Sequence, residues 1–252
     1  MGDTFLEPGL MAAGGCATGF FWSAVAGDAK LDTAKGWGRA LMGCAAGAVN
    51  AFTIYTVTDH FARDRDLARG LTLGWFGAQS GAGLANWLGR RYQWEEKPLF
   101  NAVAFPLNYA ATPLISTAGL LWGGVIGEAA SGFKAEVGFY GGMLVFNHKL
   151  CIFNAAKAGN SGAIGHCFTA KSPGDTPQHE KAHMVQTAIM GDAGTLALIG
   201  SDFMTRLFTL RWKTLGQSPG YLTLEPWAED YAAGYKGPKV SPAFVVPPAK
   251  IK

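Results

Sequence analysis

The sequence predicts a mainly α-helical protein with a Gly-rich four-helix transmembrane domain (1–130), a smaller α+β domain (131–236) and a Pro-rich tail (237–252). Composition is the first observation behind this prediction. Charged residues make up only 15% of the 252 residues, against roughly 25% in soluble domains. Glycine accounts for 35 residues, about twice its usual share. Such a chain is neither a disordered polymer nor a disulfide-dense secreted miniprotein.

Long uncharged stretches are the second observation. The stretches lie between short charged loops, and we expect helices over 8–27, 40–58, 70–89 and part of 98–127. The first three stretches are about as long as the ~20 residues that a helix needs to cross a bilayer. The fourth contains Pro106 and Pro113, so it is either a kinked span or a half-buried entry followed by a span.

Glycines at four-residue spacing recur in all four stretches. They are Gly15/Gly19, Gly43/Gly47, Gly77/Gly81 and Gly119/Gly123/Gly127. On a helix such glycines form one face that lets a second backbone approach closely, so we expect contacts with a neighbouring helix, another membrane subunit or a second copy. The alternative is a soluble Gly-rich core. It would explain four amides that need polar partners inside a bilayer, namely Asn50, Gln79, Asn86 and Asn108.

These Gly-faced helices, with the charged loop HFARDRDLARG before the third, resemble the Tim17/Tim22/Tim23 family of mitochondrial membrane proteins over residues 9–127. The resemblance implies a compact four-helix membrane domain and no chemistry. We therefore expect an integral protein of a bacterial or organelle inner membrane. Acidic residues before the first apolar stretch argue against a cleavable signal peptide. The excess of Lys and Arg in loops 28–39 and 90–97 predicts both termini on the side away from the cytoplasm or matrix.

Charge and cysteine spacing exclude other classes. The net charge is +3 and no basic run is longer than Arg90-Arg91, which argues against a nucleic-acid partner. The cysteines lack CxxC spacing, so we expect buried thiols rather than disulfides or zinc ligands. They are Cys16, Cys44, Cys151 and Cys167.

A metal-binding pattern is the third observation. His179-Glu180-Lys181-Ala182-His183 is an HExxH motif, and Pro177 suits the first turn of a helix that we expect over 178–190. His179 and His183 then project from one face and can bind one zinc ion. Glu180 can accept a proton from a zinc-bound water. The alternative is a surface helix end with two ordinary histidines.

A catalytic zinc site needs a third protein ligand. Three acidic candidates follow in the stretch LEPWAEDYA, namely Glu225, Glu229 and Asp230. If 223–232 is helical, Glu225 and Glu229 share a face and Asp230 lies about 100° further round.

Residues 148–232 resemble bacterial zincin-like metallopeptidase domains. The matching residues, after HExxH, are Gln186, Gly191, Ile199-Gly200, Glu225, Trp227, Ala228 and Glu229. The resemblance implies a zincin-like α+β domain with His179, His183 and Glu225 as zinc ligands and Glu180 as general base. It also implies that FNAAKAGNSGAIGHCFTA contains the short strand that borders the cleft. Further candidates to orient a ligand or stabilise the oxyanion are Glu229, His166 and Tyr221.

The expected function is therefore that of a membrane-bound zinc metallopeptidase acting on a peptide substrate in or at a lipid bilayer. The alternative is a non-catalytic structural subunit of a membrane complex, with Gly faces for packing and a vestigial HExxH helix. A toxin-like effector that inserts its Gly-rich half into a membrane is a third possibility. Zinc content distinguishes the first two.

Overall fold

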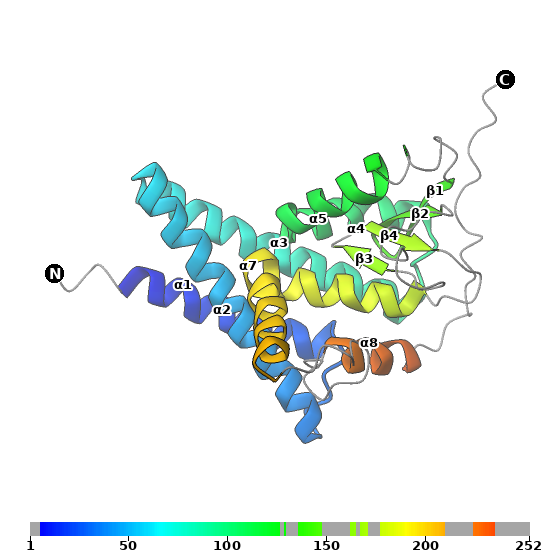
Figure 1. Cartoon of the computed structure of the whole chain (residues 1–252), viewed down its shortest axis with the longest axis horizontal. Helices are drawn as coiled ribbons and strands as arrows, with labels where there is room; N and C mark the ends of the chain where they lie inside the picture. The colour runs from blue at the N-terminus through cyan, green and yellow to red at the C-terminus, as the bar shows by residue number, and fades with distance from the viewer. Residues whose placement is uncertain are drawn as a thin grey trace.

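The computed structural model describes residues 6–126, 129, 136–147, 162–164, 167–170, 177–209 and 224–234, and these are mainly helical (Figure 1). The helices are α1 (Leu6–Val25), α2 (Ala34–Ala62), α3 (Arg65–Tyr92), α4 (Pro98–Ala111), α5 (Pro113–Gly119), the π-helical η2 (Leu120–Ile126), α7 (Pro177–Thr209) and α8 (Leu224–Ala233). The strands are β1 (Glu136–Tyr140), β2 (Met143–Asn147), β3 (Gly162–Ile164) and β4 (Cys167–Ala170). The helices predicted in the first half are confirmed.

Side-chain caps begin the two longest helices of the first half. Thr33 accepts a hydrogen bond from the Gly36 amide at 3.0 Å, at the start of α2. Asp64 Oδ1 accepts a hydrogen bond from the Leu67 amide at 2.9 Å, at the start of α3. Each side chain satisfies an amide that lacks a partner within its helix. Arg63 ends α2 in a left-handed conformation with φ 53, so the chain reverses within two residues.

Helices α1 and α2 pack through their glycine faces. A Cβ on Gly47 would overlap the carbonyl oxygen of Gly15, and one on Gly19 would overlap that of Gly43. Only residues without a side chain permit this approach of two backbones. The predicted glycine-face packing is therefore confirmed for this pair of helices, and these faces are occupied within the chain.

Gly77 and Gly81 of α3 do not pack against the backbone of another helix. A Cβ on Gly77 would meet nothing within 4 Å, and one on Gly81 would meet only the side chain of Leu107, at 2.9 Å. Gly77 and Gly81 therefore do not form a backbone-to-backbone contact, and the expectation of a glycine face against a neighbour is wrong for Gly77. Spacing alone does not distinguish a packed glycine from an open one.

The expectation of free thiols is wrong for one pair of cysteines. Cys16 and Cys44 form a disulfide, with their Cα atoms 3.7 Å apart. The physical reason is the glycine contact, because each cysteine follows a glycine of that contact, Gly15 and Gly43. Cys151 lies outside the described residues, and so does the side chain of Cys167.

One described helix, α2, has the length and apolar character that a membrane span requires. The α4 and α5–η2 segments would form a second span only if this pair, bent by 114°, is a single crossing. No other helix in the described ranges meets the same standard.

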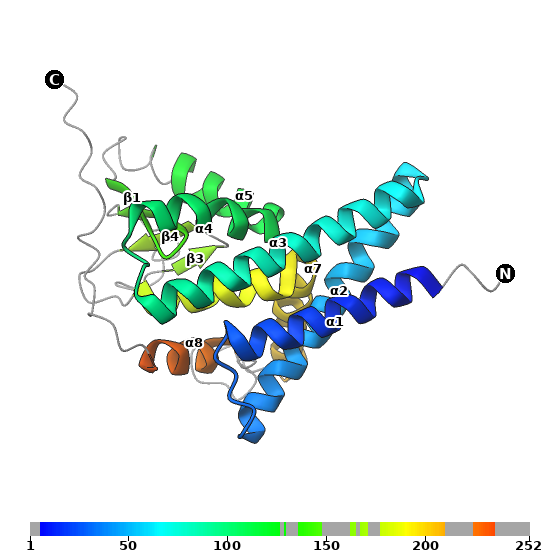
Figure 2. The ribbon, with the colours of Figure 1, turned by 180° about the vertical axis from the view of Figure 1, so that it is seen from behind.

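Helix α7 carries the HExxH motif and bends at Gly191, where φ is 72 and ψ is 176 (Figure 1). Before this bend, residues 177–190 form the helix that the sequence predicts over 178–190. A side chain at Gly191 would overlap the amide of Asn50, whose Oδ1 accepts a hydrogen bond from Ala193 N at 2.8 Å. The bend therefore places the two segments of α7 against the first-half helices, and α7 contacts both α2 and α3 (Figure 2).

The four described strands form one mixed sheet in the order β1-β2-β4-β3. The β1–β2 pair is antiparallel, with Tyr140 opposite Met143, and turns at Gly141 and Gly142, both with positive φ. Strand β4 pairs parallel to β2 and antiparallel to β3. Strand β3 is thus an edge strand, and it contacts α7.

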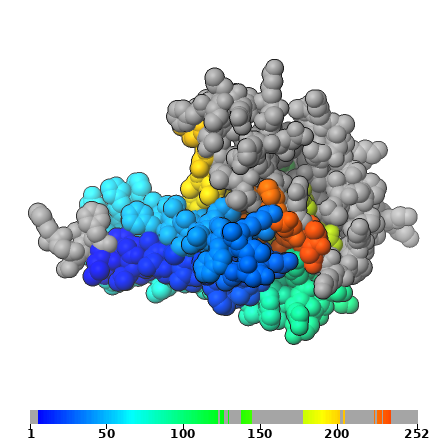
Figure 3. All heavy atoms as spheres, turned by 90° about the horizontal axis from the view of Figure 1, so that it is seen from below, coloured from blue at the N-terminus to red at the C-terminus, as the bar shows by residue number. Residues whose placement is uncertain are grey.

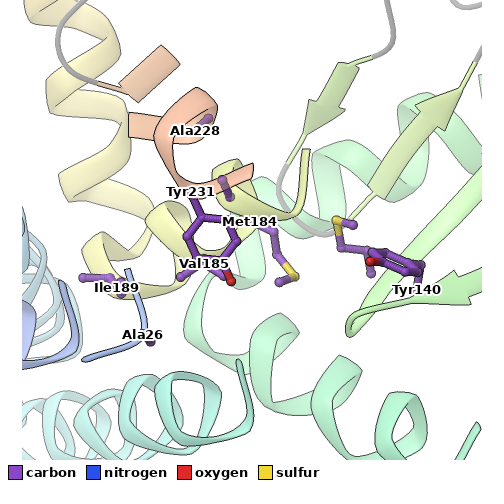
Figure 4. Packing of buried hydrophobic residues seen from close by; sticks show 9 residues of the cluster. Ala26, Tyr140, Met184, Val185, Ile189, Ala228 and Tyr231 are labelled. Carbon is purple, nitrogen blue, oxygen red and sulfur yellow. The ribbon is translucent and has the colours of Figure 1, made fainter. Parts of the chain in front are cut away.

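A hydrophobic cluster joins the two halves of the chain (Figure 4). Its members are Ala26, Tyr140, Met143, Ala182, Met184, Val185, Ile189, Ala228 and Tyr231. They come from the end of α1, the β1–β2 hairpin, α7 and α8. The domain boundary at residue 130 stays a prediction, and the described residues on its two sides share this core. The tail 237–252 lies outside the described residues.

The glycine contact gives a first testable prediction. Gly47→Ala should lower the melting temperature markedly, because its Cβ would overlap the backbone of α1. Gly77→Ala is the matched control, and it should stabilise the chain by about 0.5–1 kcal/mol because alanine is the better helix former. Thermal unfolding followed by circular dichroism, with both variants in the same buffer or detergent, checks this. Equal effects of the two substitutions would contradict the packing of α1 on α2.

Candidate metal centre

The two histidines of the HExxH motif meet at one point. The Nε2 atoms of His179 and His183 lie 3.2 Å apart, and both side chains are half-buried. The prediction that they share one face of a helix is confirmed. Two imidazole nitrogens at 2.0–2.1 Å from a tetrahedral zinc ion would be separated by ~3.3–3.4 Å. The observed spacing therefore fits a shared zinc ion with little movement of either ring.

Gln186 determines which nitrogen of His183 carries a proton. Its Nε2 donates to the backbone oxygen of Leu224 at 2.9 Å, so its Oε1 faces His183 Nδ1 at 3.0 Å. An amide oxygen only accepts hydrogen bonds, so Nδ1 of His183 is the protonated nitrogen. In the neutral imidazole, Nε2 of His183 is then unprotonated and accepts a hydrogen bond from Nε2 of His179 at 3.2 Å. The same lone pair is the one that a metal ligand would use.

The same glutamine connects the histidines to α8. Its bond to Leu224 lies at the first residue of that helix, and Glu225 is the next residue. The side chains of Glu225 and Glu229 are outside the described part of the structure, as are His166 and Tyr221. Among the described side chains, no three or more His, Cys, Asp or Glu residues gather as a metal site. The third ligand therefore stays a prediction.

Asp230, the other acidic candidate, contacts cations from α2. Its Oδ2 lies 2.5 Å from both Lys35 Nζ and Arg39 Nη2. Arg39 is buried and also donates to the backbone oxygen of Pro226 at 3.0 Å. Hydrogen bonds from Lys35 and then Arg39 lower the pKa of Asp230. Asp230 thus attaches α8 to α2, which leaves Glu225 and Glu229 as candidates for the metal.

Two aromatic residues complete the attachment of α8, which lies against the α1–α2 region (Figure 3). Trp227 is buried and donates from Nε1 to the Gly27 oxygen at 2.5 Å. Arg90, on α3, lies with its guanidinium 3.7 Å from the ring centroid of Tyr231, a cation–π geometry. The helix that carries the predicted third ligand is therefore positioned by residues of the first half.

The general-base candidate Glu180 is 8% exposed and takes part in interactions within the chain. Its neighbour Lys181 is 1% exposed and lies on the other side of the helix from the histidines. Lys181 Nζ donates to Glu95 Oε1 at 2.9 Å, and Glu95 is 2% exposed. A buried ion pair of this kind depends on further hydrogen bonds around it.

Backbone contacts of Glu95 extend the ion pair to two other elements, α4 and the β1–β2 turn. The Glu95 carbonyl accepts from Gly141 N at 2.9 Å and from Asn101 Nδ2 at 2.8 Å. Asn101 Oδ1 in turn accepts from Gly142 N at 2.8 Å. The HExxH helix, the α3–α4 connection, α4 and the β1–β2 turn therefore meet at this pair. Sequence reasoning missed it, although Lys181 shares a helix face with three apolar residues, Met184, Val185 and Ala188, a signal for a buried cation.

The four amide side chains for which the sequence indicated no polar partner each make a hydrogen bond. They are Asn50, Gln79, Asn86 and Asn108. Asn86 Nδ2 donates to Asn108 Oδ1 at 2.9 Å, and Asn108 Nδ2 donates to the Gly142 oxygen at 3.2 Å. Gln79 donates to the Ile189 oxygen, and Asn50 accepts from Ala193. These bonds satisfy the amide nitrogens of Gln79, Asn86 and Asn108 and the amide oxygen of Asn50, which would otherwise be costly to bury. The oxygens Gln79 Oε1 and Asn86 Oδ1 are buried without a hydrogen-bond partner among the described residues. All of the hydrogen bonds link first-half helices to α4, α7 or the sheet.

Comparison of the chain with known protein families, curated proteins and solved structures gave no match.

The buried ion pair gives a second testable prediction. Glu95→Leu alone should destabilise the chain by about 3–5 kcal/mol, because it leaves the Lys181 ammonium buried without its carboxylate. Lys181→Met alone should also lower the free energy of unfolding, because it leaves the Glu95 carboxylate buried without its cation. The double variant should recover most of the loss, since an apolar pair of similar volume often replaces a buried ion pair at little cost. Unfolding of the four proteins in a double-mutant cycle measures the coupling; additive losses would contradict a direct pair.

The pairing of Asp230 predicts a pH dependence. A carboxyl group whose folded pKa is lowered stabilises the fold above its unfolded pKa of ~3.9, and this stabilisation is lost as pH falls through the folded value. Asp230→Asn should therefore lower the melting temperature at pH 7 and have a smaller effect near pH 3. Asp66→Asn is the control, because Asp66 is exposed and its ion pair within the described part of the chain is with Arg69 of its own helix. A loss that does not change with pH would contradict the ionic attachment of α8.

Proposed function

We propose that this protein is a membrane-associated zinc metallopeptidase-like enzyme that hydrolyses peptide bonds. One observation carries the proposal: two histidine Nε2 atoms of an HExxH helix converge to 3.2 Å. Gln186 supports it, because this residue orients His183 and contacts the residue before Glu225. Orientation of a histidine ligand through its second nitrogen is typical of zinc sites.

In this proposal His179, His183 and Glu225 hold the zinc ion. Bound there, zinc supplies polarisation of the scissile carbonyl and a water of lowered pKa. Glu180 accepts the proton of the attacking water and delivers it to the leaving amine. Glu229 hydrogen-bonds a ligand histidine, and His166 or Tyr221 donates a hydrogen bond to the oxyanion. Gln186 keeps the Nε2 lone pair of His183 directed at the metal position.

The substrate in this proposal is an extended peptide. Strand β3 lies at the edge of the sheet and contacts the HExxH helix. An edge strand presents unpaired backbone groups to which a peptide can add as a further strand. The zincin-like resemblance of residues 148–232 agrees with this arrangement and is part of the proposal.

The first four helical segments form a membrane domain in this proposal, as in the Tim17/Tim22/Tim23 resemblance. Helix α2 supports it by its length and apolar character. Large apolar side chains exposed on α1–α3 also support it, among them Leu10, Phe21, Leu41, Phe52, Leu71 and Leu73. The lipid bilayer is then a partner of the protein, in a bacterial or organelle inner membrane.

The second candidate is a non-catalytic subunit of a membrane complex with a vestigial HExxH helix. The burial of Lys181, Met184 and Val185 favours it, because the motif's helix supplies core residues whether or not a metal binds. Metal content separates the two candidates.

The proposed metal site predicts a graded series of variants. His183→Ala and Glu225→Gln should abolish zinc retention, because each removes a ligand. Gln186→Ala and Glu229→Gln should weaken zinc affinity by ~10–100-fold, the usual effect of removing a group that orients a ligand. The measurement is zinc content per chain after dialysis against a competing chelator, with Asp230→Asn as control.

Two outcomes would contradict the proposal. Zinc absent from the unmutated chain after reconstitution would favour the structural subunit. Zinc retention that depends on Glu229 and not on Glu225 would instead identify Glu229, one helical turn further along α8, as the third ligand.

A further inference from the structure

An apolar groove lies on the hairpin of α3 and α4, away from the HExxH histidines. Its volume is about 690 Å³, within the range of ~300–1,000 Å³ typical of small-molecule sites. Leu84 and Leu88 of α3 line one side, and Val103 and Leu107 of α4 line the other. The groove runs from the α3–α4 connection to the position where Leu107 covers Gly81.

The connection end of the groove is amphipathic. Lys97 is the one charged residue of the groove lining. Within the described residues, no carboxylate lies at ion-pair distance from it. Trp94 lines the same end and stacks on Tyr92, with ring centroids 5.0 Å apart. An aromatic pair beside a lysine at the end of an apolar surface is typical of a membrane–water boundary.

We propose that this groove binds an acyl chain of an anionic phospholipid, whose phosphate contacts Lys97. The apolar lining favours an acyl chain over a peptide, because a peptide would bring backbone groups that need hydrogen-bond partners. The outer rim continues the apolar surface, with Leu84 47%, Leu99 79% and Val103 54% exposed. Lys97, which has no ion-pair partner among the described residues, supplies the charge that complements the phosphate. The site rests on the proposed membrane association of the chain and does not depend on the zinc centre.

Native mass spectrometry of the detergent-purified full-length chain tests this site. The probes are phosphatidylglycerol and phosphatidylcholine with identical acyl chains, so only the headgroup differs. We expect one tightly bound phosphatidylglycerol, preferred about fivefold over phosphatidylcholine, as for a single lysine near an anionic headgroup. Lys97→Glu should remove the preference, whereas Lys30→Glu, in a different loop, should keep it.

A groove-filling variant tests the acyl-chain contact separately. Val103→Trp should abolish the tight binding of both lipids, whereas Leu73→Trp, equally exposed on α3 but outside the groove, should retain it. Circular dichroism and thermal unfolding of the variants verify that they fold. Equal binding of the two lipids by the unmutated chain, or unchanged binding by a folded Val103→Trp variant, would overturn the proposal.

Discussion

The buried ion pair between Lys181 and Glu95 determines how the HExxH helix is turned. Lys181 lies two residues from each histidine, so its side chain projects about 200° around the helix from both. Burying this lysine against the α3–α4 connection therefore turns His179 and His183 away from that connection. The backbone of Glu95 also binds the β1–β2 turn, so the same residue positions the sheet. An apolar residue at 181 would be compatible with several rotations of the helix, whereas an ion pair favours one.

Elements from both halves of the chain position the candidate metal centre. The histidines come from α7, but the helix with the predicted third ligand is positioned by Arg39, Arg90 and Gly27. Gln186 contacts both sides, since it bonds His183 and the first residue of α8. A change in the packing of α1 on α2 would therefore reach the metal site through α8.

The parts of the structure that the sequence predicts are those that depend on local pattern. The HExxH helix and the shared face of its histidines both follow from helical spacing. Contacts between residues far apart in the sequence could not be predicted from this spacing. Gly77 has the same spacing as Gly15 but faces open space, and Cys16 pairs with Cys44 only because two helices cross there. Nothing in the local sequence distinguishes Glu95 from an ordinary exposed acidic residue in a loop. Its burial follows from its contact with the buried Lys181.

The central claim is that His179 and His183 bind one zinc ion together with a carboxylate of α8. X-ray absorption spectroscopy at the zinc edge of the reconstituted chain tests it most directly. The account predicts a four-coordinate site with two imidazole nitrogens at about 2.0–2.1 Å, the other ligands being oxygens at about 2.0–2.2 Å. Sulfur ligands at about 2.3 Å, or a zinc ion with no imidazole in its first shell, would contradict it.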